Sequence, residues 1–262
     1  MSKRVKIDIV IGFNDVKPPP NICFVPGSKP TYYKQLLYLL HSINKNWNKD
    51  IYDYQTYAFH SRHLSEDKKQ KIESLGCKVV YEPKEMQPYI NRAEIFNYET
   101  DGDYTLLFDS DMILLNTPNL DFEKDIYAKP TTPQTISSSH WEYAVNKVGL
   151  EYESGKNYHF NCGCILMNND KKKQFYKYLN DNSELLDYLH GVNRHFSIQI
   201  LYSVLFHKFD VGHLDERTNV FSKVLEGKEY HPDLPIDVLH YLGSGGFNSE
   251  VKKMLLILEK EL

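Results

Sequence analysis

The feature that most constrains the fold is an alternation of short apolar runs with helix-like segments along the first half of the chain. Apolar runs typical of buried strands cover residues 7–13, 54–59, 78–81 and 104–108. Helix-like segments lie between them at residues 32–47, 65–75 and 91–98. Strands that alternate with helices form a parallel sheet with helices on both faces. The sequence therefore predicts an α/β, Rossmann-like fold with a mostly parallel central sheet.

The second half of the chain shows the same two periods less regularly. Strand-like runs cover residues 126–128, 164–167 and 236–241, and helix-like segments cover 171–179, 183–189, 196–206 and 251–260. No internal repeat, low-complexity stretch or clear linker interrupts the 262 residues. We therefore expect a single domain over residues 1–262.

Charge and hydropathy exclude several classes of partner. The net charge is -4 at pH 7 and no basic stripe is present, so nothing indicates a nucleic-acid partner. No stretch approaches the roughly 20 apolar residues of a membrane span. The N-terminus lacks the apolar segment of a signal peptide. We expect a soluble, cytoplasmic protein.

The four cysteines, Cys23, Cys77, Cys162 and Cys164, match neither a zinc spacing nor a small disulfide framework. Buried free thiols are the expectation, and they suit a reducing compartment. Cys162 and Cys164 are two residues apart in an apolar run, so a regular strand would turn them to the same face.

An acidic triplet, Asp109-Ser110-Asp111, directly follows the apolar run 104–108 and precedes the apolar run 112–115. Two carboxylates at this spacing both face one ion if the chain turns after the strand. Carboxylate oxygens suit Mg²⁺ or Mn²⁺, which also bind phosphate oxygens. Ligands of parallel sheets bind beyond the carboxyl ends of the strands. The triplet therefore predicts a metal site at that edge of the sheet.

The triplet and its context, Phe96-Asn97-Tyr98 followed by Tyr104 to Asp111, resemble the glycosyltransferases of the GT-A fold, and in particular the glycogenin-type family 8. The resemblance implies transfer of a sugar from a nucleotide-diphosphate sugar, with a UDP-sugar favoured, to an acceptor hydroxyl on a glycan or glycoprotein. It implies Mn²⁺ (or Mg²⁺) as the cofactor. It also implies a nucleotide-binding half over residues 1–115 and an acceptor-binding half over residues 116–262.

Further short motifs fit the same family pattern. A late His-x-x-Gly segment, His240 to Gly243, implies that His240 joins Asp109 and Asp111 as the third metal ligand. The lysine that often follows this segment in the family is absent, since Ser244-Gly245-Gly246 stands there. The donor-binding residues that the resemblance implies are Phe13, Asn14, Asp15, Arg92, Asp109, Ser110, Asn161, Gly163, Gly243 and Ser244.

The stereochemical course stays open at this stage. An inverting enzyme needs a carboxylate base near the acceptor hydroxyl, for which Asp215, Glu216 and Glu142 are candidates. A retaining enzyme, as family 8 members are, needs no such base, and Gln199 is then a candidate to line the sugar site.

Two alternatives come from other classes. Asp109-Ser110-Asp111 also approaches the nucleophile motif of haloacid-dehalogenase-type phosphatases, with Asp109 as nucleophile, although Ile113 stands where that motif has Thr or Val. That motif also normally opens a chain. The second alternative is a non-catalytic binding protein with a GT-A-like fold. The donor sugar, the base, the acceptor and the oligomeric state cannot be predicted from the sequence.

Overall fold

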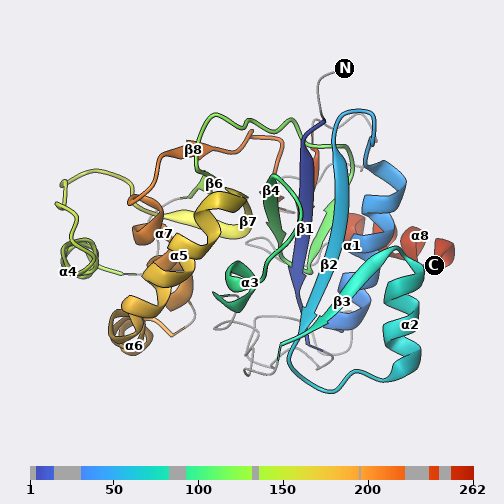
Figure 1. Cartoon of the computed structure of the whole chain (residues 1–262), viewed down its shortest axis with the longest axis horizontal. Coiled ribbons are helices and arrows are strands. Elements are labelled where there is room, and N and C mark those ends of the chain that lie inside the picture. Colours follow the sequence, from blue (N-terminus) through green and yellow to red (C-terminus); the bar gives the residue numbers. More distant parts are fainter. Residues whose placement is uncertain are drawn as a thin grey trace.

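The computed structural model describes residues 4–14, 31–82, 93–131, 136–194, 196–221, 236–241 and 249–262. Its centre is a seven-stranded sheet with the order β3-β2-β1-β4-β7-β6-β8 (Figure 1). The strands are β1 (Lys6–Gly12), β2 (Asp53–His60), β3 (Cys77–Tyr81), β4 (Tyr104–Phe108), β6 (Ile126–Pro130), β7 (Phe160–Asn168) and β8 (Val211–His213). Only β7 runs antiparallel to its neighbours, β4 and β6. The predicted mostly parallel sheet is confirmed.

Strand β1 lies at the centre of this sheet, between β2 and β4. Ile7, Ile9 and Ile11 pack into one core and Val10 into the other, so the strand is buried on both faces. After β1, the chain forms β2 and β3 on one side of that strand. It then crosses back and forms β4 on the other side of β1. Crevices at such reversals of strand order are where open α/β sheets bind their ligands.

Helices cover both faces of the sheet (Figure 1). One face carries α1 (Tyr32–Asn46) and α2 (Glu66–Ser74). The other carries α3 (Ala93–Asn97), α4 (Ser138–Lys147), α5 (Asn169–Asp181), α6 (Ser183–Val192) and α7 (Ser197–Phe206). Helix α1 begins at Thr31, whose hydroxyl accepts a hydrogen bond from the backbone N–H of Lys34, and buries Leu36, Leu40 and Ile43 along one stripe.

A three-stranded sheet extends from the end of β4. It consists of β5 (Met112–Leu114), β10 (Val238–His240) and β9 (Val220–Phe221), and α8 (Ser249–Glu261) packs against it. Strand β10 pairs antiparallel with β5, with His240 opposite Met112, and parallel with β9. This pairing brings the end of the chain beside the acidic triplet.

Strand β7 is irregular, and one prediction is wrong because of it. The pairing of β6 with β7 shifts register between Ala128 and Lys129, so extra residues of β7 lie between the paired segments. Cys164 packs with α1 and β1 in one core, whereas Cys162 packs with α7 in the other. The two thiols therefore do not share a face. Cys77, Cys162 and Cys164 are buried and form no disulfide, as expected, and Cys23 lies outside the described residues.

None of the helices that the structure describes combines the length and the apolar character needed to cross a membrane. Strands from both predicted halves of the chain enter the same seven-stranded sheet. The functional division at residue 115 stays a prediction.

Candidate metal centre and donor site

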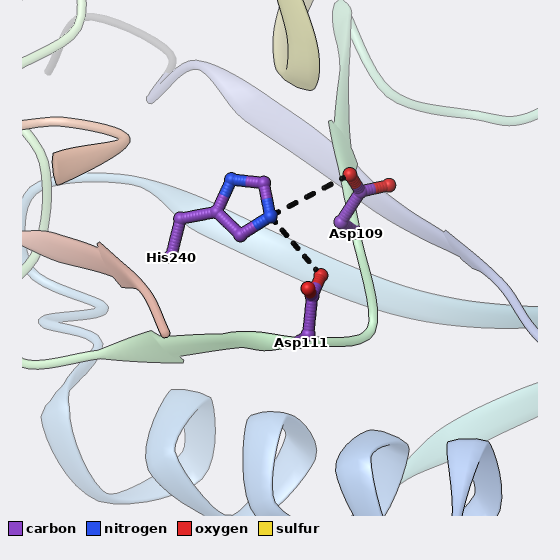
Figure 2. Close-up of side chains that lie close together, drawn as sticks. All are labelled: Asp109, Asp111 and His240. Carbon is purple, nitrogen blue, oxygen red and sulfur yellow. Dashed lines mark ion pairs between the residues drawn. The ribbon is translucent and has the colours of Figure 1, made fainter. Parts of the chain in front are cut away.

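Asp109, Asp111 and His240 converge on one point at the carboxyl end of β4. The imidazole Nε2 of His240 lies 3.2 Å from Oδ1 of Asp111 and 3.9 Å from Oδ2 of Asp109. One ligand atom from each residue lies within 4.8 Å of the other two. Figure 2 shows both carboxylates directed at the same edge of the ring. The three predicted ligands are therefore brought together from two distant parts of the chain.

Backbone hydrogen bonds hold these three residues in place. The N–H of Tyr241 donates to the carbonyl of Asp111 at 3.0 Å, which ties the end of β10 to the triplet. The N–H of Asp109 donates to the carbonyl of Gly163 at 2.8 Å, which ties the triplet to β7. Both carboxylates sit on a short turn between β4 and β5, so they face the same side.

Gly163 leaves room for the metal-centre side chains, because a side chain at this position would force them to move. A Cβ at this position would lie 2.9 Å from Oδ2 of Asp109 and 2.9 Å from Cε1 of His240. It would also lie 3.0 Å from Oδ1 of Asn161. The space beside the carboxylates is thus kept open by the glycine. Two carboxylates and one imidazole are a donor set that fits a divalent ion such as Mn²⁺.

The middle residue of the triplet has a different environment. The hydroxyl of Ser110 donates to Oε1 of Gln35 in α1 at 3.1 Å, and both residues are buried. The Ser110 side chain therefore anchors the turn to α1. Its part in donor binding stays a prediction.

Two asparagines surround His240. Oδ1 of Asn161 accepts hydrogen bonds from the backbone N–H of Gly163 at 2.9 Å and from Nδ2 of Asn219 at 2.7 Å. Oδ1 of Asn219 lies 3.1 Å from Nδ1 of His240. Asn219 is fully buried and has a φ of 58°, in the left-handed region that asparagine tolerates better than most residues. Sequence reasoning identified Asn161 and missed Asn219.

An ion pair holds the segment that carries Asn219. Nη2 of Arg217 lies 2.9 Å from Oδ1 of Asp237, just before β10, and the backbone N–H of Asp237 donates to the carbonyl of Arg217 at 2.8 Å. Burial raises the pKa of the Asp237 carboxyl above its ordinary value, although the Arg217 guanidinium acts in the opposite direction. The contacts fix residues 217–219 against the start of β10.

Gln199 lies at the start of α7, beside β7. Its Nε2 is 2.8 Å from Nε2 of His159, a buried residue just before β7, and that imidazole packs against Trp141 of α4. The sequence indicated Gln199 but gave no reason to select His159. The side chain of Gln199 is therefore held by His159, which lies two residues before Asn161 in the sequence.

The nucleoside side of the predicted site is described only in part. The amide oxygen of Asn14 accepts hydrogen bonds from the backbone N–H of Ser61 at 3.1 Å and from its hydroxyl at 3.3 Å, which joins the ends of β1 and β2. Phe13 is buried against His60, with ring centroids 5.9 Å apart. Asp15, Arg92, Gly243 and Ser244 lie outside the described residues.

The carboxylates considered as catalytic bases are not part of the cluster around His240. Asp215 accepts a hydrogen bond from the backbone N–H of Arg217 at 2.8 Å. It lines a hollow of about 400 Å³ together with Asn119, Leu120, Asp121, Tyr127, His213 and Leu214. Glu216 and Glu142 are exposed, and the group of possible metal ligands found among the described residues includes neither of them nor Asp215.

Fold and site together define the class of the molecule as the GT-A fold of glycosyltransferases, and the predicted fold is confirmed. No protein-family model and no curated protein sequence matches the chain. At the identities found among solved structures, the likeness establishes the fold.

Three solved glycosyltransferases illustrate this similarity. The galactosyltransferase LgtC, in complex with donor and acceptor sugar analogs, matches with a TM-score of 0.62 and 16% identity over 97% of this chain and 96% of LgtC. Apo GlyE of Streptococcus pneumoniae TIGR4 matches with a TM-score of 0.61 and 16% identity over 97% of this chain and 60% of GlyE. The bifunctional WbbM matches with a TM-score of 0.60 and 15% identity over 98% of this chain and 50% of WbbM.

Proposed function

We propose that this protein is a metal-dependent glycosyltransferase that moves a sugar from a nucleotide-diphosphate sugar, with a UDP-sugar favoured, to an acceptor hydroxyl on a glycan or glycoprotein. The observation that carries the proposal is the convergence of Asp109, Asp111 and His240 at the end of β4, beside β1. That place is the crevice in which sheets of this topology bind nucleotides.

The donor set suits the reaction. A divalent ion held by Asp109, Asp111 and His240 would supply positive charge where negative charge develops on the departing diphosphate. Mn²⁺ fits this set better than Mg²⁺, because Mg²⁺ prefers oxygen ligands and imidazole accepts transition metals readily. The space left by the absence of a side chain at Gly163 lies directly beside Asp109 and His240.

Donor binding is assigned in the same proposal to the residues around the centre. The ends of β1 and β2, with Phe13 and Asn14, form the side for the nucleoside, together with Asp15. Arg92, Gly243 and Ser244 are proposed to contact phosphate or sugar. Asn161 borders the centre from β7 through its contact with Gly163.

We infer a retaining course. Gln199 lies beside the strand that carries Asn161 and Gly163, and His159 holds its side chain. Asp215 instead lines a separate hollow, which does not favour it as a base. In this proposal residues 1–115 bind the nucleotide, and residues 116–262 supply the sugar and acceptor side. The buried thiols of Cys77 and Cys164, which form no disulfide, support a cytoplasmic location.

The test is a panel of nucleotide sugars incubated with the protein and Mn²⁺, with release of the free nucleotide diphosphate and the anomeric form of the product as readouts. We expect release from one UDP-sugar, abolished by chelation and by Asp111→Ala. The matched control is Asp50→Ala, which changes an exposed aspartate in the turn before β2.

Either of two results would refute the proposal and indicate one of the alternative functions. Hydrolysis of phosphate esters with beryllofluoride trapped on Asp109 would indicate the phosphatase alternative. No hydrolysis of any nucleotide sugar, and no thermal stabilisation by any nucleotide with or without Mn²⁺, would indicate the non-catalytic binding protein.

A further inference from the structure

We propose that Asn219 is the positioning residue that selects the tautomer of His240, so that Nε2 presents its lone pair to the metal centre. The inference rests on the proposed function, because it concerns the same centre. Its main readout, however, is made on the protein without metal. It follows from a chain of four hydrogen-bonding groups that begins at a backbone amide.

The backbone N–H of Gly163 fixes the orientation of Asn161. A backbone N–H can only donate, so the Asn161 atom 2.9 Å from it must be the amide oxygen. Asn and Gln side chains are often ambiguous by rotation of the amide. Here the backbone donor removes the ambiguity for the first member of the chain.

The orientation of Asn219 follows from that of Asn161. The Asn219 atom 2.7 Å from the Asn161 oxygen must be a donor, hence Nδ2. The reversed amide would place two acceptor oxygens against each other in a buried site, at the cost of an unmade hydrogen bond. Oδ1 of Asn219 is therefore the atom that faces His240.

The tautomer of His240 is then determined. Nδ1 lies 3.1 Å from an oxygen that can only accept, so Nδ1 must carry a hydrogen. In a neutral imidazole the lone pair is then on Nε2, the atom that faces Asp111 at 3.2 Å and Asp109 at 3.9 Å. Figure 2 shows Nδ1 on the side of the ring away from both carboxylates. The opposite tautomer would direct an N–H into the place of the ion.

Asn219 is held rigidly enough for this role. It is fully buried, it directly precedes β9, and β9 pairs with the strand that ends at His240. The Arg217–Asp237 ion pair fixes the residues just before it. A hydrogen-bond acceptor behind a metal-binding imidazole orients the ring and raises its basicity, and loss of such a partner typically lowers metal affinity about 10- to 100-fold.

The first measurement is the tautomer of His240 in metal-free wild-type protein, from ¹⁵N chemical shifts at mildly alkaline pH, with the signal assigned by its loss in His240→Gln. We expect a hydrogen on Nδ1. Asn219→Gly should lower the fraction of His240 that carries a hydrogen on Nδ1. A wild-type His240 whose only hydrogen is on Nε2 overturns the inference.

The second measurement is Mn²⁺ affinity, by titration calorimetry, of two variants. Asn219→Gly keeps the left-handed backbone, which glycine adopts freely, and removes the acceptor that faces Nδ1 together with the donor to Asn161. We expect its affinity to fall about 10- to 100-fold with the fold retained. Asn48→Gly, at an exposed asparagine in the turn before β2, is the matched control and should bind Mn²⁺ as tightly as wild type. Wild-type affinity in Asn219→Gly, or an equal loss in Asn48→Gly, overturns the inference.

The two proposals fail in different ways. A wild-type protein that binds no Mn²⁺ and cleaves no nucleotide sugar refutes the proposed function, while the ¹⁵N shifts still decide the tautomer. An active, Mn²⁺-dependent enzyme whose His240 tautomer is unchanged in Asn219→Gly refutes the role of Asn219 alone. If Asn219→Gly does not fold, the position of the hydrogen on the wild-type His240 ring still tests the inference.

Discussion

Gly163 lies directly against Asp109: its carbonyl accepts the backbone N–H of Asp109 at 2.8 Å, and a Cβ on it would come within 2.9 Å of the Asp109 carboxylate. The backbone hydrogen bond of Asp109 and its carboxylate thus place different requirements on residue 163. The hydrogen bond requires the two residues to be close, and the carboxylate requires that nothing project between them. Glycine meets both requirements without a shift of the neighbouring side chains.

Gly163→Ala should therefore damage the metal centre more than the fold. The methyl group must displace the carboxylate or the imidazole, and such overpacking costs typically about 1–3 kcal/mol of stability. We expect a lowered Mn²⁺ affinity and a modest fall in the melting temperature. Gly191→Ala is the matched control, because a Cβ there meets open space at the end of α6. Equal Mn²⁺ binding in both variants would contradict the steric argument.

Asp111→Asn should separate metal binding from folding. The substitution removes one negative charge and one metal-binding oxygen but keeps the size of the side chain. The metal-free protein should therefore unfold at a temperature close to that of the wild type. Thermal unfolding with and without Mn²⁺ measures this, and we expect the stabilisation by Mn²⁺ to disappear. Sugar transfer should fall at least about 100-fold, the scale seen when one group that stabilises developing charge is removed.

Ser110→Ala should lower the stability of the protein and leave metal binding intact, which is the opposite of the effect expected for Asp111→Asn. The hydroxyl donates to buried Gln35 in α1, so its loss should lower the free energy of unfolding by about 1 kcal/mol. Mn²⁺ and UDP affinity, measured by calorimetry, should stay close to wild type. A large loss of UDP affinity without loss of stability would show that the hydroxyl contacts the donor instead.

The sequence identified the first half of the fold because its strands are long enough to show their period. Strand β1 is buried on both faces and reads as an apolar run interrupted by Asp8. The elements that were missed are β8 and β9, which are only 3 and 2 residues long, and α4. The two strands are too short to show a period. The buried residues of α4, Trp141, Ala144 and Val145, do recur at helical spacing, but they cover little more than one turn.

The metal ligands were predictable and the residue behind them was not. Asp109 and Asp111 carry a local spacing that chemistry explains, and His240 lies within a recognisable motif. The role of Asn219 depends on the pairing of β9 with β10 and on its approach to Asn161, 58 residues away along the chain. In the same way, the irregular pairing of β7 reversed the expected facing of Cys162. Neither pairing leaves a mark in the sequence.

Gln199→Ala tests the sugar side of the site. If Gln199 lines the bound sugar, its loss should lower the rate of transfer while UDP and Mn²⁺ bind as before, because the nucleotide contacts are elsewhere. Steady-state kinetics and calorimetry measure the two effects. Gln174→Ala, an exposed glutamine of α5, is the control. A parallel loss of UDP affinity would instead indicate that Gln199 supports the nucleotide side.

The buried amine of Lys172 should make the stability of the protein depend on pH. Burial lowers its pKa from 10.5 to about 8, although Asp8 and Glu99 act in the opposite direction, and its ammonium donates to Thr100. Between about pH 8 and pH 10.5, the Lys172 amine is protonated in the unfolded chain and deprotonated in the folded protein. The unfolded state then binds more protons, so stability rises with pH across the window from about 8 to 10.5. Below pH 8 the penalty for the buried charge is complete, on the order of 3 kcal/mol.

Lys172→Met retains the apolar stem and removes the charge, so the variant should lack this rise. Urea unfolding at pH 7, 8, 9 and 10 measures the free energy of each protein. We expect the wild type to gain up to about 3 kcal/mol relative to Lys172→Met across this series. The comparison cancels the tyrosines that titrate in both proteins. Lys173→Met, at an exposed lysine paired with Glu99, should keep the wild-type slope. Parallel curves for wild type and Lys172→Met would show that this amine is charged throughout in the folded protein.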